Sequence, residues 1–415
     1  MSRFLLSLVL VGSLFVTVAF ASELTDSLSP GNLELKSAAQ LAFGPDGILF
    51  IADSHAAAIF AVDTKDMQPG VSPAKLEIKG INTKIAALLG VGPDDILIND
   101  FKVSPYSKAV YFAISRGRGP DGTPVILRMN GTGTITEFSL KNVRYAGVML
   151  PDAGDWKPGL GRTPNGAVNG NPRIQSITDM SYVNGKVLVA GLSNEEFASD
   201  LRVIPFPFKT ADKSTGIQIW HSSHGRYETA SPVRTFVPYT IGKEEYILAA
   251  YTCTPLVKIP LSSLKPGAKI TGTTIAELGA SNRPLEMVPY RRDGHDYVLM
   301  ANNKRGVMKV FFDNLGSYKA ITPPTAQCEQ SRESREGQGP GLGPKACQRD
   351  IEGVPYQSID SLHGVLQIAK IDDNNALILS DPAPAYPAFK LVPGQATWHA
   401  PDVGVSLDLK AIPLP

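Results

Sequence analysis

Short hydrophobic runs alternate with polar turns along most of this chain. The clearest case is residues 38–64, where Leu41 to Phe43, Ile48 to Ala52 and Ile59 to Val62 are apolar runs of strand length. Pro45-Asp46-Gly47 separates the first two runs, and Asn184-Gly185 and Asp293-Gly294 are similar turn sequences further along the chain. Such residues favour turns because they tolerate the backbone angles that turns require. Runs this short, bounded by turn residues, predict antiparallel strands rather than helices.

Weaker copies of this pattern follow towards the C-terminus. Their paired strands are expected over residues 101–103 and 109–114, 180–183 and 187–191, 236–239 and 246–250, 286–290 and 297–301, and 366–371 and 376–379. A small antiparallel sheet repeated along a chain is typical of a β-propeller. The sequence therefore predicts an all-β, six-bladed β-propeller. Seven blades remain an alternative if residues 32–36 and part of 345–362 form a degenerate blade, and a strand near 33–35 is a candidate for closing the ring.

The first residues have the features of a targeting segment. Arg3 precedes the apolar stretch Leu5 to Phe20, and Ala19-Phe20-Ala21 fits the cleavage rule for small residues. We therefore expect residues 1–21 to be a cleaved signal peptide and residues 22–415 to be a single propeller domain, secreted or periplasmic. A membrane anchor is the alternative, but the apolar stretch is short for a span.

Charge and motifs exclude several classes of function. The 40 Lys and Arg residues nearly balance the 39 Asp and Glu residues, whereas a general nucleic-acid binder needs a basic surface. We expect no nucleic-acid partner, and no membrane span after signal cleavage. The sequence has no Gly-x-Ser-x-Gly, P-loop or His-Glu-x-x-His motif, so it does not support the hydrolase and nucleotidase mechanisms that use them.

The three cysteines suggest one disulfide and one free thiol. Cys328 and Cys347 flank a polar segment that has no core of its own. In an exported protein a cross-link would hold such a loop, so we predict a Cys328–Cys347 disulfide. Cys253 follows an apolar run and is interpreted as a small buried hydrophobic residue. The alternative is that Cys253 is a metal ligand or a reactive thiol.

Propeller geometry places the long loops on one face. Loops leading into first strands emerge on the same side as loops joining second to third strands, and the long insertions are mostly of the former kind: 79–98, 139–173, 221–234 and 323–362. Long loops in a compact domain are often functional. Candidate ligand-binding residues on this face are Asp53, His55, Asn99, Arg116, Asn194, Asn303 and Asp381. Trp156 belongs to one insertion and could stack on a sugar or an apolar ligand, or anchor its loop.

Three residues are expected around the mouth of the central channel. Asp100 and Asp179 stand at the start of first strands, and His363 precedes another. Carboxylates with an imidazole can hold Ca²⁺, Mg²⁺, Mn²⁺ or another divalent ion. The alternative is that each aspartate caps a turn by binding the backbone.

A second candidate metal site lies in one loop. His221 and His224 are three residues apart, and Glu228 follows them. A His-x-x-His pair on a turn can chelate Zn²⁺ or Cu²⁺ when further ligands complete the shell. The alternative is a structural or solvent-exposed role for both histidines.

Residues 38–64 resemble a blade of the NHL or SMP-30/gluconolactonase type, from the six-bladed TolB-like propellers. In the SMP-30 type, Glu, Asn and Asp from different blades hold a divalent ion that polarises a carbonyl and activates water. The resemblance implies that Asp100 and Asp179, with Asn99 or Asn194, occupy the ligand positions. Gln40 stands where that family has its glutamate, and a neutral amide there would weaken the site.

Two functions follow from these observations. The first is an exported propeller that binds a small molecule, a glycan or a protein partner through its loop-rich face. The alternative is a metal-dependent hydrolase, similar to a lactonase or esterase, with a divalent ion at the channel mouth. Ca, Mg, Mn, Zn and Cu are the candidate ions.

Overall fold

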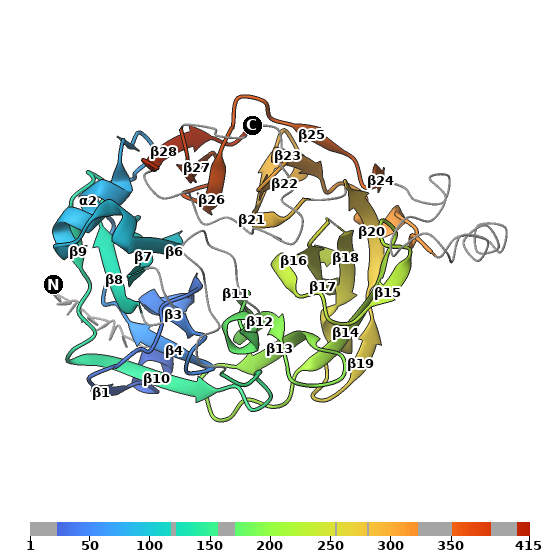
Figure 1. Ribbon diagram of the computed structural model, residues 1–415, viewed down its shortest axis with the longest axis horizontal. Coiled ribbons are helices and arrows are strands. Elements are labelled where there is room, and N and C mark those ends of the chain that lie inside the picture. The colour runs from blue at the N-terminus through green and yellow to red at the C-terminus, as the bar shows by residue number, and fades with distance from the viewer. Residues whose placement is uncertain are drawn as a thin grey trace, which may run out of the picture.

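The structure, a computed structural model, describes residues 23–117, 122–156, 171–253, 255–279, 282–322, 351–382 and 405–415. These residues form six small sheets around a central axis (Figure 1). The fold is a six-bladed β-propeller, which confirms the predicted fold class. Residues 32–36 lie in a connection, and the described residues from 351 to 362 add β24 and β25 to the edges of two sheets, so they form no seventh blade.

We number the sheets by the order of their inner strands along the chain. The first contains β2 (Leu41–Phe43), β3 (Ile48–Asp53), β4 (Ala58–Asp63), β10 (Val143–Met149) and β1 (Ser29–Gly31). The second contains β6 (Ile96–Val103), β7 (Val110–Arg116), β8 (Thr123–Met129) and β9 (Ile135–Glu137). The third contains β11 (Asp179–Val183), β12 (Lys186–Leu192), β13 (Ser199–Pro205), β14 (Thr215–His221) and β15 (Arg226–Glu228), with β19 (Lys269–Thr271) parallel to β14.

The remaining three sheets have similar designs. The fourth contains β16 (Val233–Ile241), β17 (Glu244–Tyr251), β18 (Pro255–Pro260), β20 (Thr273–Leu278) and β24 (Ile351–Gly353). The fifth contains β21 (Pro284–Arg292), β22 (His295–Asn302), β23 (Gly306–Phe311) and β25 (Tyr356–Ser358). The sixth contains β26 (Val365–Lys370), β27 (Asn375–Ser380), β28 (Asp408–Pro413) and β5 (Glu77–Ile78). The α-helices are α1 (Glu23–Asp26) and α2 (Ile81–Leu89), and the 3₁₀ turns are η1 (Pro45–Gly47), η2 (Pro93–Asp95), η3 (Pro172–Gln175), η4 (Leu261–Ser263) and η5 (Leu315–Ser317).

The hairpins between first and second strands form where turn residues predicted them. Asn184 and Gly185 both have positive φ, 46° and 77°, and Asp293 and Gly294 repeat this with 52° and 85°. Two-residue turns with this conformation match the twist of the strands that they join. All six predicted strand pairs are present, with longer strands at β6, β16 and β21 than the sequence indicated.

The sheets do not follow chain order around the ring. The inner strands are neighbours in the cyclic order β2, β6, β26, β21, β16 and β11 (Figure 1). The first sheet therefore lies between the second and the third. After the second sheet the chain returns, and β10 pairs with β4 before the chain enters the third sheet.

The sequence pattern also predicts residues 75–78 as the fourth strand of the first sheet and residues 405–409 as the fourth strand of the sixth. The outer strands differ from the sequence-based expectation in three places. The N-terminal strand is Ser29–Gly31 rather than a strand near 33–35, and it pairs with β10 on the outside of the first sheet. Residues 77–78 form β5 as an outer strand of the sixth sheet, because they pair with β28 and not with β4. Asp408–Pro413 is the third strand of that sheet rather than its fourth. These pairings join distant segments and close the ring.

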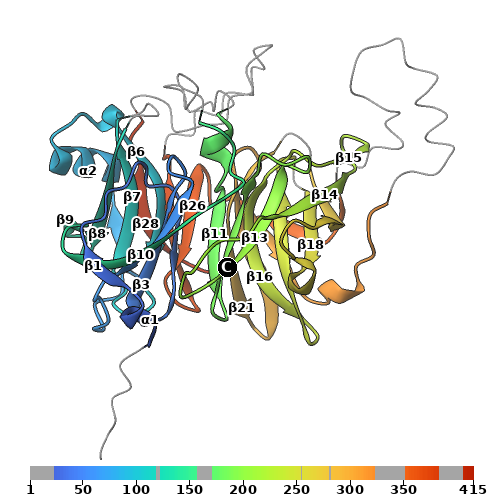
Figure 2. The same ribbon diagram turned by 90° about the horizontal axis from the view of Figure 1, so that it is seen from below.

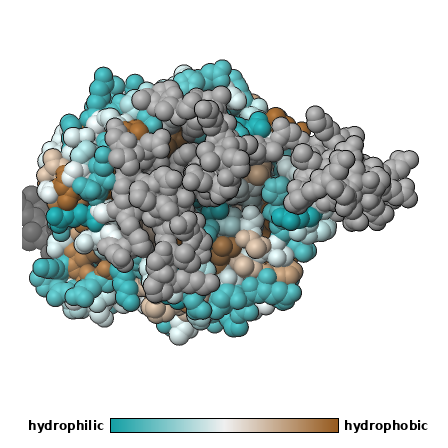
Figure 3. Space-filling model, viewed as in Figure 1, coloured by the Kyte–Doolittle hydropathy of each residue, from teal (hydrophilic) through white to brown (hydrophobic). Residues whose placement is uncertain are grey.

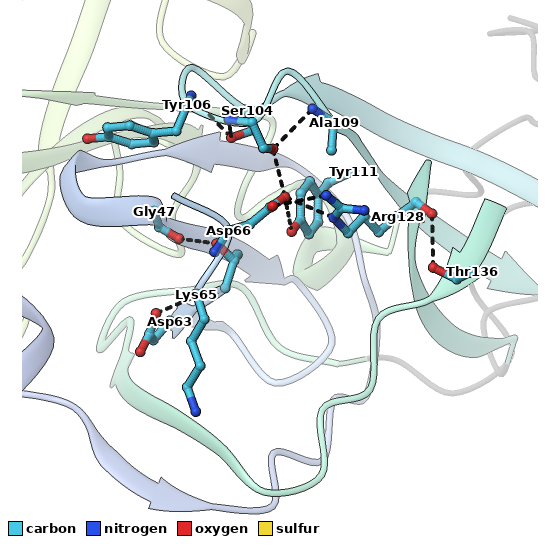
Figure 4. Close-up of polar contacts among 12 residues, drawn as sticks. Gly47, Asp63, Lys65, Asp66, Ser104, Tyr106, Ala109, Tyr111, Arg128 and Thr136 are labelled. Atoms are coloured by element: carbon cyan, nitrogen blue, oxygen red, sulfur yellow. Dashed lines mark hydrogen bonds and ion pairs between the residues drawn. The ribbon is translucent and has the colours of Figure 1, made fainter. Parts of the chain in front are cut away.

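A partly buried ion-pair network connects the first and second sheets (Figure 4). Asp66 follows β4, and its carboxylate accepts two hydrogen bonds from Arg128, at 2.8 and 2.9 Å. It also accepts hydrogen bonds from the hydroxyls of Ser107 and Tyr111, at 2.7 and 2.9 Å. Burial alone would raise the pKa of Asp66, but these donors outweigh it and the pKa is lowered.

We expect Asp66→Ala to lower the free energy of unfolding by about 2 kcal/mol, because it leaves Arg128 and Tyr111 without their common acceptor. Urea denaturation would measure this change. Asp63→Ala is the matched control, since the Asp63 side chain accepts only a local bond from the Lys65 amide among the described contacts. Equal stability of the two variants would contradict a structural role for the network.

Among the described residues, the two long connections that contain α2 and β15 lie on one side of the ring, as predicted. Figure 2 shows α2 and β15 on the same side. Figure 3 views this face, whose coloured rim is mostly hydrophilic with small, scattered hydrophobic patches. Among the described residues, we find no helix of the length and hydrophobicity needed to cross a membrane.

Candidate metal centre

Asp100 and Asp179, which were expected to hold a metal ion at the channel mouth, both lie near the side chain of a lysine, Lys102. Lys102 Nζ lies 3.3 Å from Asp100 Oδ1 and 2.9 Å from Glu286 Oε2. Asp179 is close enough to raise the pKa of Lys102 further. These residues come from β6, β11 and β21, so one ammonium group links three sheets. A protein cation thus accompanies the carboxylates that the hydrolase hypothesis assigned to a metal ion.

The same aspartates also bind the backbone of neighbouring sheets. Asp100 Oδ2 accepts a hydrogen bond of 2.8 Å from the amide of Leu41 on β2. Asp179 Oδ2 accepts one of 2.8 Å from the amide of Phe236 on β16. This is the backbone-binding role weighed as the alternative, except that each bond joins two sheets rather than capping a local turn.

Burial dominates the titration of these carboxyl groups. It raises the pKa of Glu286 to about 8 and that of Asp179 to about 6, although Lys102 acts to lower both. The pKa of Asp100 is raised for the same reason. One ammonium group cannot fully neutralise three buried carboxylates, so burial favours the protonated form of these acids.

The other candidates for the ligand-binding face are spread around the ring. Asp53 is buried and accepts hydrogen bonds from the Lys36 amide, the Ser37 hydroxyl and the Ala56 amide. Asn303 accepts a bond from the Arg283 amide, and Asp381 donates its amide to Gly364. The exposed candidates are Arg116, Asn194 and His363. His363 has no described hydrogen bond or ion pair to Asp100 or Asp179.

Two of the candidates do meet, with the aromatic candidate beside them. His55 and Asn99 line the same cleft between the first and second sheets. The ring of Trp156 packs on His55 with centroids 4.3 Å apart. Cys328 and Cys347 lie outside the described residues, so their disulfide stays a prediction.

The second metal hypothesis gains a ligand that the sequence did not assign to it. His221 ends β14, His224 lies in the turn before β15, and Cys253 follows β17 of the next sheet. One metal-binding atom from each of these residues lies within 4.8 Å of the others. Tetrahedral zinc, with bonds of about 2.0–2.3 Å, would need donor separations of roughly 3.3–3.8 Å. Small side-chain movements would therefore bring the three atoms onto one ion.

Glu228 orients both imidazoles. Its Oε2 lies 3.0 Å from His221 Nδ1 and its Oε1 lies 2.6 Å from His224 Nδ1. Arg226 donates to the same carboxylate at 3.1 Å. With Nδ1 of both rings occupied, Nε2 is the atom available to a metal. A carboxylate behind a ligating histidine is the usual outer-shell arrangement, so Glu228 lies behind the rings instead of among the ligands.

One ring nitrogen at this site is buried without a regular partner. His221 is fully buried, and its Nε2 makes no hydrogen bond of normal geometry to the described residues. A buried polar atom in this state requires an explanation. The ring centroids of His221 and His224 lie 3.8 Å apart with the planes tilted by 36°, and a metal-binding atom of Cys253 lies within 4.8 Å of one on each histidine. A metal ion would satisfy the orphaned nitrogen.

Backbone strain also marks Cys253. It has a φ of 64°, in the left-handed region that favours glycine. Its amide donates a 2.6 Å hydrogen bond to Asn282, which anchors the turn. Non-glycine residues in this conformation concentrate at functional sites. The side chain of Cys253 is half-buried beside His221 and His224, so its interpretation as a buried hydrophobic residue is wrong.

Opposite charges perturb the titration of the whole cluster. Contacts with Cys253 and Glu228 raise the pKa of His224 to about 9. Burial acts to lower the pKa of His221, but the same two partners outweigh it and the pKa is raised. Both histidines in turn hold the pKa of Glu228 well below its usual range despite burial. Shifts of this kind cluster at functional sites as well as in structural ion pairs.

A further buried acid faces the cluster. Glu277 on β20 is fully buried, and its Oε1 accepts a 2.7 Å bond from the Ser222 amide. Its charge influences both His221 and Cys253. It is not part of the 4.8 Å group. Among the described His, Cys, Asp and Glu residues, the group therefore has three members and no fourth.

Comparisons with known proteins do not identify a family. No protein-family model matches the sequence, and no curated protein matches it. A solved structure of PQQ-bound aldose sugar dehydrogenase from Streptomyces coelicolor is 13% identical, with a TM-score of 0.28, over 93% of this chain and 97% of that one. Streptogramin B lyase is 10% identical, with a TM-score of 0.29, over 93% and 97%. A protein of unknown function from Dyadobacter fermentans is 9% identical, with a TM-score of 0.32, over 93% and 98%.

These likenesses are too weak to carry an argument about this protein. All three TM-scores lie below 0.5 and all three identities at or below 13%. The propeller fold rests on the sheets themselves. The resemblance of residues 38–64 to NHL or SMP-30 blades stays a prediction.

Proposed function

We propose that this chain is an exported β-propeller that binds one zinc or copper ion through His221, His224 and Cys253. The observation that carries this proposal is the convergence of three ligand atoms within 4.8 Å, with a single carboxylate holding Nδ1 of both imidazoles. The proposal that the protein is exported depends only on the sequence of residues 1–21, which lie outside the described part of the chain.

The donor set selects the ion. Two imidazoles and a thiolate are soft or borderline ligands, which suit zinc and copper better than calcium or magnesium. The carboxylate group around Lys102 is less suited, because the ammonium already neutralises part of its charge. We therefore place the metal at the junction of the third and fourth sheets and not at the channel mouth.

An open coordination position gives this ion a function beyond structure. Three protein ligands and a free position are typical of catalytic zinc, whereas structural zinc has four protein ligands. The ion, when bound, supplies Lewis acidity to a ligand that approaches from the loop-rich face. The small-molecule or protein partner expected on that face would bind here. A metal-dependent hydrolase reaction, the alternative function, would use the same centre.

Elemental analysis of the mature protein, purified without chelators or metal-affinity tags, tests the proposal. We expect close to one equivalent of zinc or copper in the wild type and almost none in a His221→Ala/His224→Ala variant. His295→Ala/His363→Ala is the matched control, because it also removes two histidines and should keep its metal. Wild-type protein that stays metal-free after incubation with Zn²⁺ and Cu²⁺ would overturn the proposal.

A further inference from the structure

A second site lies at the mouth of the ring, away from the metal centre. A cleft of about 80 Å³ opens between the first and second sheets beside η3. Gln40 precedes β2 and Ser54 follows β3, so both belong to the loop-rich face. A volume of this size has room for several water molecules, and thus for the end of a small organic ligand.

Two oxygen atoms in this cleft are buried without partners. Ser54 is only 3% exposed, and its hydroxyl makes no hydrogen bond to the described residues. The side-chain oxygen of Gln40 is buried in the same state. Burying a polar group without a partner costs about 1–3 kcal/mol. A ligand that binds both oxygens would remove that cost.

The neighbouring polar wall is preorganised. The Asn99 amide donates 2.8 Å hydrogen bonds to the carbonyl of Ala38 and to the hydroxyl of Ser115. Gln367 of the sixth sheet donates a 2.7 Å bond to the Asn99 carbonyl. This wall therefore stays in place when a ligand arrives, which lowers the entropic cost of binding.

The lining indicates an uncharged ligand with one apolar side. It contains no Asp, Glu, Lys or Arg. Leu97, Ile174 and Ile177 supply apolar surface to the same lining. A hydroxylated ring has this amphipathic character, because its hydroxyls point outward from a C–H face. Trp156 packs on His55, a residue of the lining, with ring centroids 4.3 Å apart, and an indole next to the cleft could stack on such a ring.

We propose that this cleft binds a neutral hydroxylated molecule, such as one sugar unit, with its hydroxyls on Ser54 and Gln40 and its C–H face on Leu97, Ile174 and Ile177. The Gln40 oxygen can only accept a hydrogen bond, whereas the Ser54 hydroxyl can donate or accept. A vicinal pair of hydroxyls satisfies both residues. The proposal is independent of the metal, because the cleft and the metal centre use different sheets.

The test is ligand-observed NMR and calorimetry with D-glucose, D-galactose and glycerol as neutral probes. D-glucuronate serves as a charged analogue. We expect saturable binding of at least one neutral probe, and no comparable binding of glucuronate. Ser54→Ala should weaken that binding about fivefold to tenfold, as expected for one neutral hydrogen bond. Ser193→Ala is the matched control, because Ser193 follows β12 as Ser54 follows β3 and its hydroxyl already has a partner.

Several results would overturn the proposal. These are failure of every neutral probe to bind, equal binding of glucuronate, or full binding by both Ser54→Ala and Gln40→Leu. Such results would mean that the cleft binds only water. The Gln40→Leu variant keeps the test decisive if Ser54→Ala does not fold. The His221→Ala/His224→Ala variant should bind the neutral probe normally, so a failed metal proposal and a failed sugar proposal give different results.

Discussion

Replacement of Lys102 by methionine is expected to lower the free energy of unfolding by about 3–5 kcal/mol near pH 8. The reason is that Asp100 and Glu286 lose the ammonium group that lies 3.3 and 2.9 Å from them. The acids come from different sheets, so the repulsion acts across the centre of the ring. Denaturant titration, monitored by circular dichroism, measures the change.

The loss should depend on pH in a definite direction. The pKa of Glu286 is about 8 in the folded chain and that of Asp179 about 6, both above their ordinary values. Between the ordinary and the raised pKa, the folded state holds more protons than the unfolded state, so stability falls as pH rises. Removing Lys102 raises both pKa values further. The destabilisation by Lys102→Met should therefore be smaller at pH 5 than at pH 9.

Lys213→Met provides the control for this experiment. Its ammonium lies 2.7 Å from Glu195, but both side chains are largely exposed, so little change is expected at any pH. If Lys102→Met were as stable as the wild type at pH 8 and 9, the carboxylates would not depend on the lysine. In that case the channel mouth would again be a candidate for a divalent ion.

Replacement of Cys253 by serine is expected to lower the affinity for zinc or copper by more than about 100-fold. Loss of even an outer-shell partner typically costs 10–100-fold, and this change removes a thiolate ligand. Competition with a chromogenic chelator measures the affinity. The copper-loaded wild type should also show a thiolate-to-copper charge-transfer band, which the serine variant lacks.

Cys253→Gly separates metal binding from folding. Glycine adopts the φ of 64° without the steric cost that a side chain brings, so the metal-free variant should be no less stable than the wild type. It should nevertheless lose the metal as the serine variant does. Wild-type affinity in both variants would exclude Cys253 from the site. A large loss of stability in the glycine variant would show that the side chain is needed for packing.

The two proposed sites share a face but differ in chemistry. The cleft presents neutral polar atoms and apolar surface, while the metal centre presents two imidazoles, a thiol and buried acids. A hydroxylated ligand held in the cleft would extend over the loop-rich face. Repeating the sugar titration with and without metal tests whether one ligand contacts both sites, because the affinity for such a ligand would change when the metal is removed.

Local pattern was sufficient for much of the fold. The apolar runs and the turns at Asn184-Gly185 and Asp293-Gly294 determined six strand pairs, because side-chain alternation and left-handed turn residues are properties of adjacent positions. The same periodicity predicted a loop for His221 and His224 on the loop-rich face, and the structure differs only in making His221 the last residue of β14. These inferences needed no contact between distant segments.

Only the tertiary structure decided which distant residues meet. The pairing of β5 with β28 joins residues more than 300 positions apart, and nothing in a two-residue strand specifies its partner. Lys102 lies beside carboxylates of other sheets, and Cys253 lies beside the two histidines of a neighbouring sheet. Packing between sheets produces both contacts. The sequence by itself determined the repeated sheet and the chemistry that each loop carries, whereas packing between sheets determined which of those groups form a site.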